Sequence, residues 1–199
     1  GTSVAIIDER IVVGAPGDSD NGTGSGSAYV YRFDGSSWQE EAKLLASDGS
    51  TDDYFGNSVV VDADTVVVGT RYADENGYNS GGAYIYRFDG FGWNETKLLA
   101  DDGDEYDQFG YCVSLSGNNL AVGAYWDDEN GSASGSAYLF DMASSSCPDL
   151  NNDEIVGVND LLFVIDYWGQ SNSTADLNSD GIVDVTDLLI VVGNWGPCE

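Results

Sequence analysis

The feature that most constrains the fold is an internal repeat with a spacing of 54–55 residues. The segment Ala28–Gly35 returns as Ala83–Gly90 and, in shortened form, as Ala137–Asp141. A Val-Val-Gly-Ala motif beginning at Val12 and a Phe-Gly pair beginning at Phe55 recur at the same spacing. Because separate segments share one register, the first two thirds of the chain are expected to consist of equivalent structural units.

Each unit is expected to form four short strands. In the central unit they are predicted at Ser58–Asp62, Thr65–Gly69, Ala83–Phe88 and Trp93–Leu99, with an acidic Asn-Gly turn between the second and the third. Tandem four-stranded units of about 50 residues are typical of a β-propeller. The predicted fold class is therefore mainly β: three four-stranded blades of an incomplete propeller over residues 1–142, then a small α-helical domain.

These motifs resemble a known family. The Phe-Gly pair, the Val-Val-Gly-Ala motif and the Gly-Ser-Ala-Tyr-Val-Tyr run at residues 26–31 are similar to the FG-GAP repeat, over roughly residues 1–142. That repeat builds the seven-bladed head of integrin α subunits and occurs in many bacterial surface proteins. The resemblance implies an extracellular propeller for adhesion or ligand binding, often with Ca²⁺ in its blade loops.

Calcium in the blades is the less favoured interpretation. The turns that would hold the integrin-type calcium loop, such as Asp62-Ala63-Asp64, are too short for an Asp-x-Asp-x-Asp-Gly insertion. We expect the loop carboxylates to be solvated turn residues. The alternative calcium ligands in this part of the chain are Asp18, Asp20, Asp74, Glu75, Asp127 and Asp128.

The number of repeat units is small for a propeller. Only three are present, and the last lacks the strand that contains Trp and Lys-Leu-Leu in the others. Propellers close with about four to eight blades. We therefore expect the sequence to be a C-terminal fragment of a longer protein, with closure by oligomerisation as the alternative.

A second repeat, with a period of 27 residues, begins after a short linker at residues 143–146. Asp149–Asp160 returns as Asp176–Asp187, and each copy is followed by an apolar helical pattern that ends near a glycine, Gly169 or Gly196. The i, i+1, i+4, i+7 spacing of apolar residues predicts one apolar stripe in each copy: Leu161, Leu162, Ile165 and Trp168, and Leu188, Leu189, Val192 and Trp195. Residues 147–199 are therefore predicted to form a separate domain.

Both copies have the spacing of an EF-hand-type calcium loop. Side-chain oxygens at loop positions 1, 3, 5 and 12 and a backbone carbonyl at position 7 surround one centre when such a loop curls. Gly181 at position 6 and Asp184 at position 9 make the second loop the better one. The sequence thus predicts two Ca²⁺ sites, with ligands Asp149, Asn151, Asp153, Ile155 and Asp160 in the first and Asp176, Asn178, Asp180, Ile182, Asp184 and Asp187 in the second.

Duplicated loop–helix units without an entering helix resemble the type I dockerin domain. The resemblance covers residues 147–199 and implies docking onto a cohesin-type module. At the family's recognition positions, often Ser-Thr, this chain has Val158-Asn159 and Val185-Thr186. Cys147 and Cys198 bracket the domain, and the termini of a two-fold duplicated domain lie close together. This predicts a Cys147–Cys198 disulfide and an oxidising, extracellular compartment.

The charge excludes several functions. The formal net charge is −29 and there is no His. Such a surface repels nucleic acids and anionic membranes, and no apolar run approaches a membrane span. Ser–His–Asp and Cys–His nucleophiles are absent, so no catalytic residues are assigned and the chain is not expected to be an enzyme. Cys112 is predicted to be a part-buried strand residue.

The resulting hypothesis is a non-catalytic, calcium-binding protein, secreted or surface-attached and of bacterial type. Its propeller would bind a protein or glycan, and its dockerin-like domain would anchor it. The alternative is the C-terminal accessory part of a secreted polysaccharide-degrading enzyme whose catalytic module lies upstream. A third interpretation treats both modules as structural spacers.

Overall fold

The computed structural model describes residues 1–129, 131–142, 148–151, 153, 155–171, 174–178 and 180–197. By its contacts the chain divides into two compact units, Gly1–Met142 and Ala143–Glu199. Each unit is described separately below. No described helix is long and apolar enough to cross a membrane.

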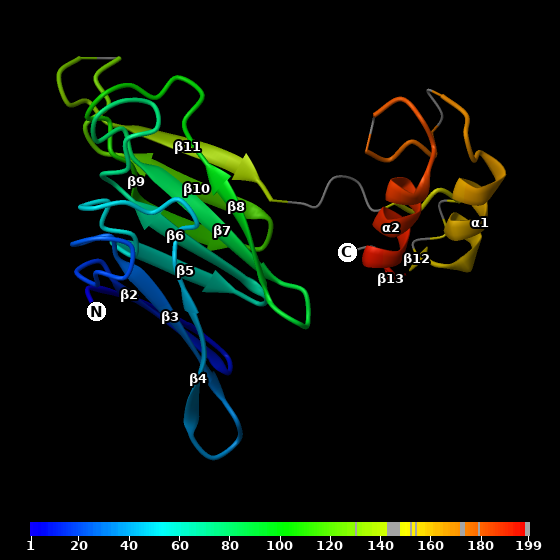
Figure 1. Cartoon of the computed structure of the whole chain (residues 1–199), viewed down its shortest axis with the longest axis horizontal. Helices are drawn as coiled ribbons and strands as arrows, with labels where there is room; N and C mark the ends of the chain where they lie inside the picture. The colour runs from blue at the N-terminus through cyan, green and yellow to red at the C-terminus, as the bar shows by residue number, and fades with distance from the viewer. Residues whose placement is uncertain are drawn as a thin grey trace. The chain divides into compact units, whose positions relative to one another are not determined.

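The first unit consists of three antiparallel sheets that follow one another in sequence order (Figure 1). Each sheet is a meander in which every strand pairs with the next in the chain. The strands of the first sheet are β1 (Ser3–Ile7), β2 (Arg10–Ala15), β3 (Ser27–Phe33) and β4 (Trp38–Leu44). Those of the second are β5 (Ser58–Asp62), β6 (Thr65–Thr70), β7 (Gly82–Phe88) and β8 (Trp93–Leu98). Those of the third are β9 (Phe109–Ser116), β10 (Asn119–Ala124) and β11 (Ser136–Asp141).

The strands predicted for the central unit are confirmed to within one residue at each end. The short turn between β5 and β6 closes because Ala63 adopts a positive φ of 45°. The third described sheet has three strands and not the four of a complete blade. This agrees with the absence from the last repeat of the Trp-containing motif that forms β4 and β8.

Neighbouring sheets pack face to face through alternating strand residues. In β5, Val59 and Val61 are buried against the first sheet, whereas Val60 points to the third sheet. The equivalents of Val59 and Val61 in the first sheet are Val4 and Ile6, which are 69% and 65% exposed. The two buried cores of this unit thus lie between sheets, and one face of the first sheet is uncovered among the described residues.

Pairs of glycines, here called the glycine seams, form the closest backbone contacts between neighbouring sheets. A Cβ atom built on Gly14 of β2 would lie 2.0 Å from the carbonyl oxygen of Gly56, and one on Gly69 of β6 would lie 2.1 Å from that of Gly110. Only hydrogen fits at such distances. The glycine of the Val-Val-Gly motif in one unit therefore contacts the glycine of the Phe-Gly pair in the next, which explains why both motifs recur.

Cys112 lies in strand β9 as predicted, but its predicted partial burial is wrong, because this residue is exposed. Its equivalents Ser3 and Ser58 each bond to the next sheet: the Ser3 hydroxyl donates to the Gly56 carbonyl, and the Ser58 hydroxyl accepts from the Val113 amide. No further sheet covers β9 on that side among the described residues, so the same position is open to solvent.

The second unit contains two nine-residue helices, α1 (Val158–Asp166) and α2 (Val185–Gly193), and a two-residue pairing of β12 (Ile155–Val156) with β13 (Gly196–Pro197). The two copies interlock. Val156 of the first copy pairs with Gly196 after α2, and Val183 of the second exchanges backbone hydrogen bonds with Gly169 and Gln170 after α1. This exchange places both helices in one small core.

Only part of each predicted apolar stripe packs on the core of this unit. The core of this unit is formed by Val156, Val164, Ala175, Val183 and Val191, with Leu161 and Leu188 packed beside it. The other predicted stripe residues are about half exposed: Leu162, Ile165, Trp168, Leu189, Val192 and Trp195. A nine-residue helix packed against one partner buries a narrower face than its apolar residues could cover.

Candidate functional site

Acidic loops join the second and third strands of each sheet in the first unit. In the first sheet, the Lys43 ammonium lies 2.6 Å from an Asp20 oxygen and 3.4 Å from an Asp18 oxygen. It also lies 5.0 Å from the centre of the Tyr29 ring. Hydrogen bonds from Ser27 and Tyr29, together with Lys43, hold the pKa of Asp18 below its usual value.

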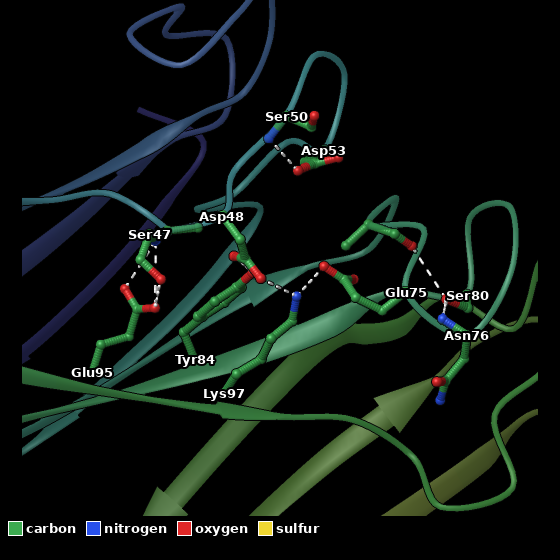
Figure 2. Close-up of polar contacts among 12 residues, drawn as sticks. Ser47, Asp48, Ser50, Asp53, Glu75, Asn76, Ser80, Tyr84, Glu95 and Lys97 are labelled. Atoms are coloured by element: carbon green, nitrogen blue, oxygen red, sulfur yellow. Dashed lines mark hydrogen bonds and ion pairs between the residues drawn. The ribbon is translucent and has the colours of Figure 1, made fainter.

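The second sheet repeats this arrangement (Figure 2). Lys97 reaches between Asp48, at 2.8 Å, and Glu75, with which it also forms an ion pair. Its ammonium lies 5.1 Å from the centre of the Tyr84 ring, and the Tyr84 hydroxyl donates a 2.5 Å hydrogen bond to Asp48. Burial, and then this charged neighbour, raise the pKa of Tyr84 well above its usual value.

The six alternative calcium ligands of the blade loops do not converge. Asp18 and Asp20 bind Lys43, Glu75 binds Lys97, and Asp74 accepts a backbone hydrogen bond from Asn79 at 2.7 Å. Asp127 is 2% exposed and accepts a hydrogen bond from Tyr138, while Asp128 is exposed. The structure thus distributes these carboxylates over three separate loops, and lysine forms ion pairs with Asp18 and Asp20 in the first and with Glu75 in the second.

Aromatic side chains gather where these loops leave the strands. The Tyr111 and Tyr125 rings are stacked, with centres 4.8 Å apart, and Trp126 contacts Tyr125 edge-on at 5.6 Å. The Arg71 guanidinium lies between the Tyr72 and Tyr111 rings, 4.7 and 5.7 Å from their centres. Tyr111, Tyr125 and Trp126 are 37%, 55% and 49% exposed, so this aromatic cluster presents flat apolar faces to solvent.

In the second unit, the first predicted calcium loop curls around its carboxylates. The Asp153 amide donates to the side-chain oxygens of Asp149 and Asn151, at 3.1 and 2.9 Å. The Ile155 amide donates to Asp153 at 3.0 Å. Loop positions 1, 3, 5 and 7 are therefore linked to one another.

The second loop has the same geometry. The Asp180 amide donates to Asp176 and Asn178 at 3.2 and 3.0 Å, and the Ile182 amide donates to Asp180 at 3.0 Å. Gly181 has the positive φ, 95°, that the sequence required at position 6. Asp184 caps α2, because its carboxylate accepts a hydrogen bond from the Thr186 amide at 2.7 Å.

Asp160 and Asp187 close the two loops and are fully buried. Asp187 accepts from the Leu177, Asn178 and Asp184 amides at 2.7, 3.2 and 2.8 Å. Burial alone would raise the pKa of Asp187, but these amides outweigh it and hold the pKa below its usual value. Asp160 is bound in the same way by three amides of its own loop.

In both loops, backbone amides donate hydrogen bonds to the position-12 carboxylate. Among the residues that the structure describes, no three Asp, Glu, Cys or His side chains form a group that could hold a metal ion. The structure therefore brings the sequence-predicted ligands into the same two loops, and their carboxylates accept hydrogen bonds from amides of those loops. The predicted disulfide partners Cys147 and Cys198 lie outside the described residues.

Comparison with protein families gives a match for the first unit. A family model described as the FG-GAP repeat matches residues 1–31, 38–86 and 89–140. The chain belongs to the FG-GAP repeat family. The first match covers β1, β2 and most of β3. The second match begins at β4 and the third contains β8, so each of these two repeats comprises the outer strand of one propeller-like sheet and the first three strands of the next. Comparison with curated proteins finds no match to this chain.

Two features of this FG-GAP unit were not predicted from the sequence. The lysine–carboxylate contacts join residues 22–49 positions apart, and no local pattern indicates them. The aromatic cluster could have been found, because Tyr111, Tyr125 and Trp126 replace Asn57, Arg71 and Tyr72 of the preceding repeat. These aromatic residues, which differ from the residues at the equivalent positions of the preceding repeat, face solvent. Tyr84 and Tyr86, which recur as aromatic residues in the other repeats, are buried.

Proposed function

We propose that this protein is a non-catalytic, calcium-binding protein of the bacterial exterior. Its FG-GAP sheets bind a protein or glycan ligand, and its C-terminal unit is a dockerin-like module that anchors it to a partner of cohesin type. The observation that carries the proposal is the pair of equivalent loops, each closed by a fully buried aspartate at position 12.

The donor set of these loops suits a hard cation. In the first loop Asp149, Asn151, Asp153 and Asp160 would supply side-chain oxygens and Ile155 a carbonyl, and in the second loop Asp176, Asn178, Asp180, Asp187 and Ile182 would do the same, with Asp184 as a further oxygen. No Lys or Arg occurs after Lys97, so the chain itself offers no nearby cation in sequence to neutralise these carboxylates. A bound Ca²⁺ would offset this charge and add to the stability of a small core.

A calcium titration of the full chain tests this proposal. Hydrogen exchange of amides in α1 and α2 is measured with Ca²⁺ and after chelator is added. We expect protection of both helices with Ca²⁺ and its loss with chelator. Asp180→Ala, at position 5, should abolish the response of α2, whereas Asp166→Ala, on the exposed end of α1, should leave it intact. Equal protection with and without Ca²⁺ would refute the calcium sites.

Uncovered apolar residues on the two helices and just after them support the docking role. Leu162, Ile165 and Trp168 of the first copy are 47–51% exposed, and Leu189, Val192 and Trp195 of the second are 48–60% exposed. Exposed apolar faces of this kind mark protein interaction surfaces. Leu162→Lys with Ile165→Lys should leave calcium binding unchanged and abolish capture by a cohesin module, whereas unchanged capture would contradict the docking role.

The aromatic cluster of Tyr111, Tyr125 and Trp126 supports ligand binding by the FG-GAP unit. Flat, rigid aromatic faces combine a large contact area with little loss of side-chain entropy. The same surface would also serve an accessory part of a polysaccharide-degrading enzyme. Binding of soluble polysaccharides is measured for the native chain and for Tyr125→Ala. We expect binding that the substitution weakens about tenfold, with Tyr106→Ala as the matched exposed-tyrosine control.

A further inference from the structure

The outer edge of the third sheet differs from those of the other two. β4 covers the edge of β3 and β8 covers the edge of β7, whereas β11 pairs only with β10 among the described residues. In the register of the covered edges, Ala28 pairs with Leu44 and Ala83 with Leu98. Both alanines are fully buried, but their equivalent Ala137 is exposed. β11 therefore presents an open edge at which the first two sheets carry a strand.

In the covered sheets, the outer strand also supplies a lysine at a fixed position. Tyr29 pairs with Lys43 and Tyr84 pairs with Lys97, and each ammonium lies about 5 Å above the ring of the tyrosine that it faces. Each lysine also binds two loop carboxylates. The residue of β11 in the place of these tyrosines is Tyr138.

The carboxylates that would receive such a lysine are already in place in the third sheet. The Tyr138 hydroxyl donates to Asp102 at 2.8 Å and to Asp127 at 3.1 Å. Asp102 and Asp127 occupy the positions of Asp48 in the second sheet and Asp18 in the first, both of which bind lysine. No ion pair reaches Asp102 or Asp127 among the described residues. This group of Tyr138, Asp102 and Asp127, called the acidic site below, thus has the carboxylates and the aromatic ring but no lysine ammonium.

The neighbouring charges show the same difference. Burial raises the pKa of Asp53, which lies between β4 and β5, and Glu75 and Asp74 raise it further. The Ser50 amide and Lys97 act in the opposite direction. Burial and the carboxylates of Asp127, Asp104 and Asp128 raise the pKa of Asp107, the equivalent residue between β8 and β9, and the Asp104 amide acts in the opposite direction. Lysine therefore offsets the negative potential beside the second sheet but not at the acidic site, and the six Lys and Arg of the chain all lie at or before Lys97.

We propose that the open edge of β11 binds an extended segment of another polypeptide that contains a Lys-Leu pair, as a fourth antiparallel strand. The lysine of that segment would lie over the Tyr138 ring and bind Asp102 and Asp127, and the leucine would cover Ala137. Main-chain hydrogen bonds to the edge provide affinity, and the carboxylates of the acidic site provide specificity for lysine. The inference is independent of the calcium loops and of the aromatic cluster.

The test uses the full chain and a labelled peptide with the sequence of the second outer strand, residues 91–100. Binding is measured by fluorescence anisotropy, and hydrogen exchange locates it. We expect the peptide to protect the β11 amides from hydrogen exchange. Its affinity should be at least about tenfold higher than that of the same peptide with Lys97→Gln, because the glutamine peptide lacks the charge-assisted hydrogen bonds of the ammonium. Asp102→Asn in the protein should reduce the affinity, whereas its neighbour Asp101→Asn should not.

Other outcomes would overturn the proposal. Equal affinity of the lysine and glutamine peptides would show that the acidic site does not select an ammonium. Protection from hydrogen exchange in the first two sheets, and not in β11, would show that the peptide binds elsewhere on the protein. If Ca²⁺ alone bound in a way that depends on Asp102, the acidic site would be assigned to a metal ion instead of a strand.

Discussion

Replacing Gly69 by alanine tests whether the glycine seams hold the sheets together. The new Cβ atom would lie 2.1 Å from the Gly110 carbonyl oxygen, whereas real Cβ contacts are not found below 3.0 Å. β6 and β9 must therefore separate by about 0.9 Å at this point. Gly69 has an ordinary negative or extended φ, so the substitution adds a steric clash without a change in backbone preference.

The cost follows from two contacts. Overpacking of a close backbone contact destabilises by about 1–3 kcal/mol. The 3.0 Å hydrogen bond from the Gly56 amide to the Gly69 carbonyl would also be strained, at a cost of about 1 kcal/mol. We expect a loss of about 2–4 kcal/mol in the free energy of unfolding of the first unit.

Native-state hydrogen exchange of amides in β6 and β9 measures this free energy within the full chain, because it reports each unit separately. The matched control is Gly92→Ala, since a Cβ atom at Gly92 meets nothing within 4 Å. The control should change stability by less than about 0.5 kcal/mol. If the two substitutions have the same effect, the seam does not depend on hydrogen at this position, and the reasoning is refuted.

Three further predictions concern charge. Lys97→Gln should lower the free energy of unfolding by about 1 kcal/mol or less, and added salt should reduce this difference. The same substitution should raise the pKa of Asp48, which an NMR titration measures. The pKa of Asp187 is lower in the folded state than its usual value of 3.8. Its charged carboxylate therefore stabilises the fold fully above pH 3.8, and this contribution is lost as the pH falls through the folded-state pKa. Asp187→Asn should therefore make the stability of the second unit, followed by hydrogen exchange, lower at neutral pH and less dependent on pH in the acid range. Asp107 has the opposite effect on stability, because its pKa is raised in the folded state. Its charged form destabilises the fold at neutral pH, so Asp107→Asn should raise the melting temperature at pH 7 more than at pH 4.

Much of the fold could be predicted because the signals are local. Alternation of apolar and polar residues, short turns and a repeat of 54–55 residues were sufficient to place β5, β6, β7 and β8 to within a residue. The two oxygen-rich loops were found in the same way, since each occupies one continuous segment. The place of Gly181 at a positive φ was also predictable, because the loop spacing itself requires it.

Burial was less predictable, since it depends on what packs against an element. Val4 and Val59 occupy equivalent positions, yet one is 69% exposed and the other 8%, because only the second has a sheet in front of it. Cys112 and Ala137 are exposed where their repeat equivalents are covered. Leu162 and Val164 are both apolar residues of α1, and only the partner helix and loops decide that Val164 is the buried one.

The sequence by itself determined the repeat units, their strands and the chemical character of the C-terminal loops, because these follow from spacing along the chain. Only the tertiary structure decided which atoms meet across units. It brought Gly69 to Gly110, placed Lys97 between Asp48 and Glu75, and left Tyr138 with two carboxylates and no lysine. Such contacts join residues tens of positions apart, so they arise from the packing of one sheet on the next and the pairing of an outer strand, neither of which a local pattern specifies.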